Sequence, residues 1–459
     1  MKKFTNLLLA CITVSLMLSC SKKEENNVTT APKTPDGKII IAGEISGEQT
    51  WKASEKYLLR GFVYVTEGAT LTIEPGTVIF GDKDSKGTLV VERGGKIIAE
   101  GTEAAPIVFT SNQPAGSRGY GDWGGVVLVG RAPVNQASPT MEGGIRGTYG
   151  GNDENDNSGV LKYVRIEFAG IAFQPNSEIN GLTLYGVGRD TKIDHIQISY
   201  CGDDSFEWFG GTVNSKHLVA YRGWDDDFDT DFGFSGKVQF GFAVRDRRYA
   251  DVSQSNGFET DNFNPGTPEN GPKTSPVFAN ITCYLADTAS QIPTTGLGSG
   301  QFVNGMHIRR NSGTSAFNSV FVGYPFGLRI DNSPTWVNVQ NDVVQVRGVV
   351  LAGFSTGQDV VAAGAGSPAT FTTTDVRTWF NTAASGNETK NTADLGLGTI
   401  SNLDNPQRLP NTGSPLLTGA VWTGKGADAF FEKVNFRGAF GTSDWTQGWT
   451  EFNPQAKQY

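Results

Sequence analysis

Acidic, histidine and arginine side chains recur at one position of a repeated strand motif, where they could perform acid–base chemistry. In each motif an apolar residue stands on either side of the polar one, as in Phe228-Asp229-Thr230 and Met306-His307-Ile308. Two carboxyl groups can act as general acid and base on a glycosidic bond, and calcium with an arginine base can drive elimination from a uronate. The sequence therefore offers a candidate catalytic set: Asp229 and Glu259 as acid and base, His307 as their orienting partner, and Arg329 as a substrate clamp or base.

Further polar residues lie beside this position and extend the predicted binding surface. Side chains alternate between the two faces of a strand, so a residue two positions further along faces the same side. Trp224 offers an aromatic surface for a sugar ring, whereas Trp208 is expected to point inward. The residues predicted to contact a ligand are Glu207, Asp261, Arg309, Asp331 and Trp224.

The carboxylates of this arrangement stand close enough to repel one another. Neighbouring strands are about 4.8 Å apart, and two like charges at that distance repel by about 3 kcal/mol at an effective dielectric near 20. A bound cation, a shared proton, or Arg309 and Arg329 could relieve this repulsion. Calcium is the predicted cation, because it accepts six to eight oxygens at about 2.4 Å; the alternative is a solvated acidic face without metal. The candidate metal ligands are Asp203, Asp204, Asp225, Asp226, Asp227, Asp229 and Asp231.

The elements that position these residues are short strands repeated about every 22 residues. Inward apolar residues align in one column, and the spacings between successive members of the adjoining polar column are 22, 30, 48 and 22 residues. A period near 22 leaves no room for the crossover helices of βαβ units and favours a solenoid of parallel strands. An antiparallel sandwich or propeller is the alternative, but the hairpin signals that it requires are missing from the sequence. The aligned apolar column is Phe206, Phe228, Phe258, Met306 and Leu328.

The predicted fold is all-β, with the parallel β-helix spanning residues 38–355. Residues 356–459 are predicted to form C-terminal coils and a capping region. Short helical patterns at Asp375–Phe380 and Ala427–Lys433 are expected to cap the C-terminal end, where an open edge would invite aggregation.

Two histidines and two cysteines outside the polar column are predicted to be structural. His195 and His217 begin core strands of another sheet, and Cys201 and Cys283 lie in apolar strand patterns that suggest buried free thiols. No Ser/His/Asp order, Cys/His zinc spacing, phosphate-binding loop or dinucleotide fingerprint is present in the sequence.

The N-terminus has the pattern of a secretory signal. Lys2 and Lys3 precede an apolar stretch, Leu7–Leu18, which is shorter than the roughly 20 residues that span a bilayer. Residues 17–20 resemble a lipobox, which implies cleavage before Cys20 and lipidation of this cysteine; ordinary cleavage nearby is the alternative. Residues 1–20 are therefore the expected lipoprotein signal peptide, and residues 21–37 a flexible polar tether.

The charge balance argues against a nucleic-acid partner. Loss of Lys2 and Lys3 from the 38 basic residues leaves 36 against 47 acidic ones, a net formal charge of −11. Binding to phosphate requires a basic face. We therefore expect no nucleic-acid partner.

Four motifs resemble those of a known family. They are Gly121–Gly125, Tyr163–Gly170, Asp203–Gly211 and Arg437–Phe440, and they are similar to motifs of secreted Bacteroidota lipoproteins with a pectin-lyase-like, right-handed, single-stranded parallel β-helix. The resemblance implies this fold and an envelope location, and it implies no particular reaction. Lys23-Glu24-Glu25 also resembles the signal that sends such lipoproteins to the cell surface; the alternative is a linker that faces the periplasm.

Two functions follow as hypotheses. The favoured one is a lipid-anchored, surface-exposed outer-membrane protein that binds an extracellular ligand, a glycan or a ligand held through a cation, beside an outer-membrane transporter. The alternative is a polysaccharide lyase or glycoside hydrolase. An open groove over His307, with the carboxyl groups of Asp229 and Glu259 about 5 to 9 Å apart, would favour the hydrolase. A groove filled by the loop 262–276 would favour the binding protein.

Overall fold

The computed structural model describes residues 32–459 except 138, 175–176, 264–270, 286–299 and 401. The predicted signal peptide with Cys20 and the first part of the predicted tether lie outside these residues, so lipidation stays a prediction. Over the described residues, no helix has both the length and the apolar character that crossing a membrane requires.

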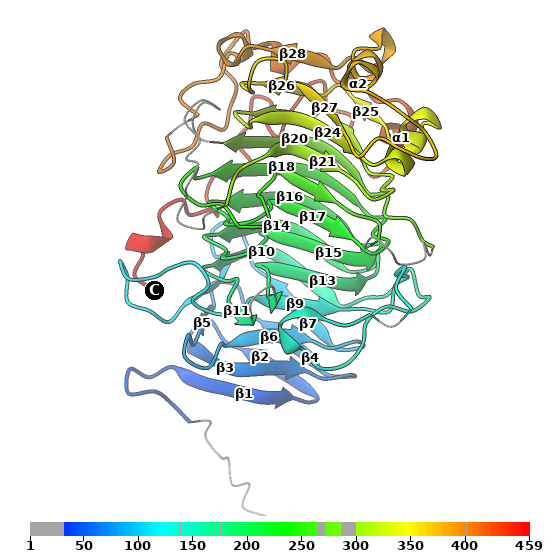
Figure 1. Cartoon of the computed structure of the whole chain (residues 1–459). Helices are drawn as coiled ribbons and strands as arrows, with labels where there is room; N and C mark the ends of the chain where they lie inside the picture. Colours follow the sequence, from blue (N-terminus) through cyan, green and yellow to red (C-terminus); the bar gives the residue numbers. More distant parts are fainter. Residues whose placement is uncertain (1–31, 138, 175–176, 264–270, 286–299, 401) are drawn as a thin grey trace, which may run out of the picture.

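The chain forms the predicted right-handed parallel β-helix, whose coils stack from the N-terminal to the C-terminal end (Figure 1). One of its three faces carries the polar column, and we call it the site face. It receives the ends of β1 (Ile39–Ile45) and β3 (Lys56–Val65). Its other strands are β6 (Thr88–Val91), β9 (Val126–Val129), β13 (Leu182–Val187), β15 (Phe206–Gly211), β17 (Phe228–Asp231), β19 (Phe258–Thr260), β21 (Asn304–Ile308), β24 (Phe326–Asp331) and β27 (Val360–Ala363).

The other two faces share five long strands that bend at a corner. These strands are β10 (Gly159–Glu167), β14 (Lys192–Ser199), β16 (Asn214–Tyr221), β18 (Lys237–Arg245) and β20 (Val277–Leu285). Their first halves continue the second face: β2 (Glu48–Trp51), β4 (Thr70–Ile73), β7 (Lys96–Glu100), β22 (Ser315–Phe317) and β25 (Val346–Arg347). Their second halves continue the third face: β5 (Val78–Gly81), β8 (Ile107–Ser111), β23 (Val320–Val322), β26 (Val350–Ala352) and β28 (Glu388–Lys390).

The register between coils confirms the predicted columns. Phe206 pairs with Phe228, Phe228 with Phe258, and Phe258 with Met306, which pairs with Leu328. All five side chains are buried in the central core. The rings of Phe206 and Phe228 stack at 5.7 Å between centroids. Trp208 also points inward as predicted, and both Cys201 and Cys283 are buried free thiols.

A residue in the left-handed backbone region makes the corner between the second and third faces on successive coils. This conformation is uncommon for residues other than glycine. It lets each long strand serve two faces, because the chain turns sharply at a single residue. The corner residues are Tyr163, His195, His217, Phe240, Asn280 and Asn318.

The C-terminal part of the chain both caps the solenoid and covers its third face. Helices α1 (Ser333–Gln340) and α2 (Thr373–Phe380) pack at the C-terminal end, where Val376 and Phe380 join the core. The chain after α2 then returns along the third face towards β10, as the orange and red ribbon shows (Figure 1). The predicted helix at Ala427–Lys433 is wrong: a short 3-10 turn spans Gly424–Ala427, and residues 428–433 form no helix.

A small insert crosses the outside of the site face near its N-terminal end. It contains a 3-10 turn at Glu142–Gly144 (η1) and an antiparallel hairpin of β11 (Ala172–Gln174) and β12 (Ser177–Glu178). Met141 and Ile179 pack with Tyr185 and Phe209 of the site face in a second apolar cluster. The outer side of the site face is therefore covered in part.

Truncation of Phe228 tests the importance of the core column. Phe228→Ala removes a fully buried ring that stacks on Phe206 and meets Phe258 edge-on, and it should lower the free energy of unfolding by about 3–5 kcal/mol. Val252→Ala is the control, because Val252 is 64% exposed. Urea-unfolding midpoints measured by tryptophan fluorescence compare the two variants, and equal midpoints would contradict this account of the core.

Candidate functional site

The structure brings the five predicted polar residues of the central column onto successive coils of the site face. Glu207 pairs in register with Asp229, and Asp229 with Glu259. The column continues through His307 to Arg329. The order derived from the sequence spacing is thus confirmed, and coil-to-coil stacking places each side chain directly beside the next.

The acidic half of this column collects six carboxyl groups. Oxygens from Asp204, Glu207 and Asp229 lie within 4.8 Å of one another, as do those from two further overlapping groups. Among the described residues, no basic side chain forms an ion pair with any of the six. The acidic half consists of Asp203, Asp204, Glu207, Asp225, Asp226 and Asp229.

These carboxyl groups are much less exposed than the sequence predicts. Alternation along the strand directs Glu207 away from the core, yet it is only 7% exposed. The insert supplies the cover: Asn180 donates a hydrogen bond to the Glu207 carboxylate, and the carboxyl group of Glu142 lies near enough to repel it. The insert therefore covers part of the outward-facing polar column. Strand alternation fixes direction, but it carries no information about an insert that lies outside the strand.

Burial and mutual repulsion make it costly to ionise the acidic half. Burial, followed by the charge of Glu142, raises the pKa of Glu207 well above its usual range. Burial and the charge of the neighbouring Glu259 likewise raise the pKa of Asp229 well above its usual range. Burial raises the pKa of Asp225 to about 7. Within the described residues, Oδ1 of Asp225 and Oδ1 of Asp229 are covered and accept no hydrogen bond. The acidic half therefore needs protons or a cation.

The second half of the column is neutralised by internal ion pairs, and we call it the paired half. Arg309 donates two hydrogen bonds to Asp261, of 2.7 and 2.8 Å, and also contacts Glu259. His307 bridges two acids, with Nδ1 3.3 Å from Glu259 and Nε2 3.2 Å from Asp331. These residues hold one another in place.

Charges in the paired half also set the protonation of its acids. Burial acts to raise the pKa of Glu259, but the hydrogen bond from His307 and the charge of Arg309 hold this pKa below its usual value. His307 and Arg329, whose Nη2 lies 3.0 Å away, likewise hold the pKa of Asp331 below its usual value. Glu259 is therefore an ionised, paired carboxylate.

Two of the predicted site residues, Asp227 and Trp224, lie away from the carboxylates of the site face. Asp227 is fully buried in the core, 3.2 Å from the guanidinium of Arg245, so its assignment as a metal ligand with Asp229 is wrong. Strand β17 begins only at Phe228, and alternation does not extend to the turn residue before it. Trp224 packs against the rings of Tyr120 and Tyr249 rather than on the site face.

Asp231 begins a separate outer row with Asp261. Burial and the charge of Asp261 raise the pKa of Asp231 well above its usual range. Asp261 itself is held by Arg309 and Arg310, the latter at 2.6 Å. Asp231 thus lies beside the acidic half, but it belongs to the outer row, in which Arg309 and Arg310 neutralise the charge of Asp261.

A cavity beside the paired half adds residues that the sequence did not single out. It has a volume of about 290 Å³, and Phe263, Arg310, Asn311 and Asn332 are among the residues that line it. An aromatic face with a cation and amide groups suits a sugar carrying hydroxyl or carboxylate groups. Arg310 follows directly after the predicted Arg309, which is the one signal that could have pointed to it.

Together these features define a pectate-lyase-like β-helix with a charged site face. The sequence matches the family described as "Pectate-lyase like beta helix domain" over residues 43–450, and the chain belongs to this family. Among solved structures it is similar to pectate lyase Pel9A, with 13% identity over 83% of this chain and 89% of that one and a TM-score of 0.39. The Dettilon tailspike protein (gp208) has 13% identity over 72% of this chain and 62% of that one, with a TM-score of 0.27. No curated protein matches the sequence.

The raised pKa of Asp225 predicts a pH-dependent stability. The folded chain holds this proton more tightly than the unfolded chain, so the stabilisation is complete below about pH 4 and is lost as the pH rises through about 7. In the presence of EDTA, Asp225→Asn should therefore become more stable relative to wild type as the pH rises from about 4 to about 7. Urea unfolding at pH 4, 6 and 8 measures the difference.

The exposed Asp84→Asn variant is the matched control for this series. Its difference from wild type should stay the same across the pH range. A pH-independent difference for Asp225→Asn would contradict the assignment of a tightly held proton.

Proposed function

We propose that the site face binds an extracellular glycan in a calcium-dependent manner. The observation that carries this proposal is the division of charge along one column: the acidic half has no ion-pair partner among the described residues, whereas the paired half is compensated by its own arginines and histidine. A calcium ion bound by the acidic half would complete the charge balance.

The chemistry of the acidic half suits calcium. Calcium takes oxygen ligands at about 2.3–2.6 Å in a flexible geometry, and the carboxylates of adjacent coils already converge within 4.8 Å. The covered oxygens of Asp225 and Asp229 that accept no hydrogen bond are ready acceptors for a cation. Calcium would also lower the raised pKa values, because a positive charge favours the ionised form.

A glycan with carboxylate groups fits this face. The open coordination positions of the calcium ion would receive carboxylate or hydroxyl oxygens of the sugar. Arg310 and the ring of Phe263 in the neighbouring cavity would contact the next part of the chain. The candidate ligand residues Glu207, Asp261, Arg309 and Asp331 then play different parts: Glu207 binds the cation, Arg309 and Asp261 orient each other, and Asp331 orients His307.

Cleavage of the glycan is the second candidate function. The pKa of Asp229 is raised and that of Glu259 is lowered, and such a divergence is typical of an acid paired with a base or nucleophile. Against this, Glu259 is occupied by contacts with His307 and Arg309. Binding is therefore the better supported function. Part of the loop 262–276 lies outside the described residues, and its place over the groove stays a prediction.

We also infer that the protein is anchored to the outer membrane through lipid on Cys20, exposed at the cell surface, and works beside an outer-membrane transporter. The apolar Leu7–Leu18 stretch, the lipobox resemblance and the polar residues 21–37 support this inference. Multiple acyl chains give a stable anchor where one would be marginal.

A glycan array with the purified residues 37–459, read for both binding and cleavage, tests the proposed function. Wild type should bind acidic glycans in calcium and lose about tenfold or more of its affinity in EDTA. Asp229→Asn should bind weakly under both conditions, because it removes a ligand of the acidic half. Glu48→Gln, which changes an exposed acid of β2, is the control and should behave as wild type.

The same array separates the two candidate functions. Release of oligosaccharide by wild type, but not by Glu259→Gln or His307→Ala, would establish the enzyme in place of the binding protein. If EDTA changes neither glycan binding nor the melting temperature, the calcium site is refuted.

Lipid attachment has its own test. Cys20→Ser should abolish incorporation of radiolabelled palmitate and move the protein from the membrane fraction to the soluble fraction. Cys11→Ser, within the expected signal peptide, is the control and should leave both unchanged. Labelled protein in the Cys20→Ser variant would contradict the anchor.

A further inference from the structure

We propose that Asp194, His195 and His217 form a binding site for a divalent transition metal, with zinc as the type case. The site lies at the corner between the second and third faces, on β14 and β16. It goes beyond the proposed glycan binding, because none of its three residues belongs to the site face.

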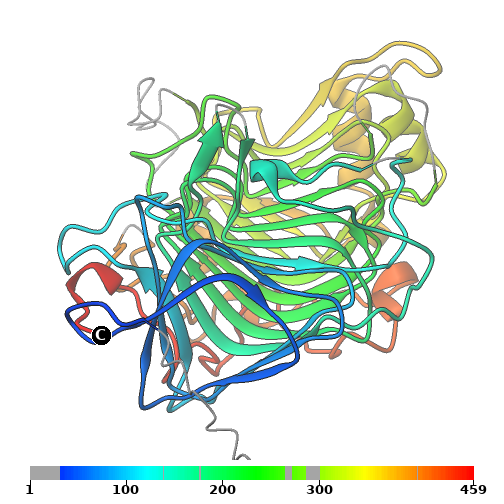
Figure 2. The same cartoon turned by 90° about the horizontal axis from the view of Figure 1, so that it is seen from below.

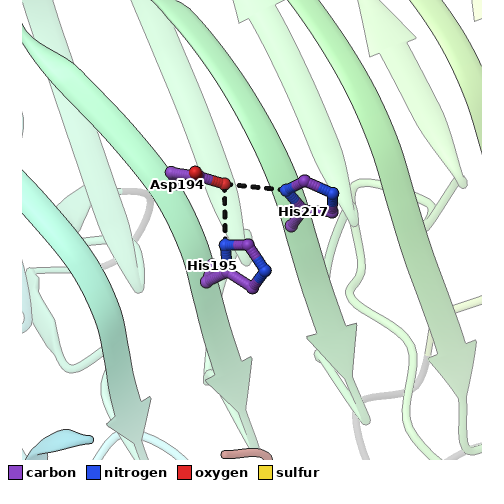
Figure 3. Close-up of side chains that lie close together, drawn as sticks. All are labelled: Asp194, His195 and His217. Carbon is purple, nitrogen blue, oxygen red and sulfur yellow. Dashed lines mark hydrogen bonds and ion pairs between the residues drawn. The ribbon is translucent and has the colours of Figure 1, made fainter. Parts of the chain in front are cut away.

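The three side chains converge on one point (Figure 3). Nδ1 of His195 and Nδ1 of His217 each lie 2.8 Å from Oδ1 of Asp194, and all three ligand atoms lie within 4.8 Å of one another. Zinc binds histidine nitrogen at about 2.0–2.1 Å and carboxylate oxygen at about 2.0–2.2 Å. Tetrahedral ligands at those lengths are about 3.3 Å apart, so small side-chain rotations would admit the ion.

The backbone holds both histidines in matching orientations. His195 and His217 are corner residues with φ of 56° and 54°, and they occupy the same place on adjacent coils. Their rings stack with 4.2 Å between centroids, with Tyr163 on one side and Phe240 on the other. A metal site needs ligands that are fixed in advance by their surroundings, and this stack fixes them.

Packing by itself does not explain why these two positions are histidines. The same corner position holds tyrosine on the coil before and phenylalanine on the coil after, and both rings pack against the neighbouring histidine. The histidines add two nitrogens directed at one carboxylate. Oδ1 of Asp194 accepts a hydrogen bond from His217, whereas Nδ1 of His195 is covered and has no hydrogen-bond partner of suitable geometry among the described residues. Nδ1 of His195 is therefore free to bind a metal ion.

Solvent reaches the site from two sides. Asp194 is 36% exposed and contributes to a cavity of about 400 Å³, and His217 contributes to another of about 440 Å³. A fourth ligand, water or a small carboxylate, can therefore complete the coordination. Lys162 and Lys216 flank Asp194 on the neighbouring coils, and Lys216 is neutralised by Glu432 at 2.7 Å. The remaining positive charge favours an anionic fourth ligand.

The full chain, stripped of metal with EDTA, should be titrated with Zn²⁺ by calorimetry at pH 7.5. With calcium in excess, so that the acidic half of the site face is already occupied, we expect one Zn²⁺ per chain with a Kd of about 1 µM or tighter, and visible absorption bands when Co²⁺ replaces Zn²⁺. Binding should weaken as the pH falls below about 6.5, where histidine takes up protons.

Three variants assign the site. His217→Asn and Asp194→Asn each remove one ligand while keeping a similar shape, and each should weaken binding by about tenfold or more. His307→Asn is the matched control: it changes the remaining histidine of the three in the chain and should leave Zn²⁺ binding unchanged. Circular dichroism of the metal-free variants checks that they fold.

The outcomes are distinct from those of the glycan experiment. The site is refuted if wild type shows neither Zn²⁺ binding below about 100 µM nor Co²⁺ bands, a result that needs no variant to fold. It is also refuted if binding persists in both ligand variants or is lost in His307→Asn. The glycan experiment tests calcium at the site face. If glycan binding proves independent of calcium, the Zn²⁺ titration at Asp194, His195 and His217 is unaffected.

Discussion

The stacking of one coil on the next governs everything else in this protein. Parallel strands lie about 4.8 Å apart, so any residue type that recurs at one position of the coil becomes a row of contacts. Apolar residues such as Phe206, Phe228 and Phe258 turn this repetition into a continuous core. Charged residues turn it into repulsion or into a chain of ion pairs, and both outcomes occur on the site face.

The site face resolves its charge in two different ways along one column. Where arginines and a histidine alternate with acids, as around Glu259 and Asp331, the side chains neutralise one another and are held in place. Where only acids follow one another, burial raises their pKa values, and in the part of the chain that the structure describes some of their covered oxygens accept no hydrogen bond. The proposed divalent cation would satisfy this second arrangement at neutral pH, because it would keep the carboxylates ionised and bind several of them at once.

The corner between the second and third faces uses the same repetition for a different purpose. A left-handed residue turns each coil there, and its side chain stacks on that of the next coil. Most members of this column serve packing or, as Asn280 does, donate hydrogen bonds to the returning C-terminal segment. His195 and His217 are the two members that carry imidazole nitrogens, and Asp194, on the same strand as His195, brings a carboxylate to both.

The sequence by itself determined the coil, the strand register and the order of residues in the polar column, because alternation and coil length are local properties of the chain. Only the tertiary structure decided what lies over and between those residues. The insert that covers Glu207 and the inward turn of Asp227 towards Arg245 depend on contacts between distant segments. The meeting of two corner histidines at one carboxylate likewise depends on the left-handed turn, which strand periodicity does not encode.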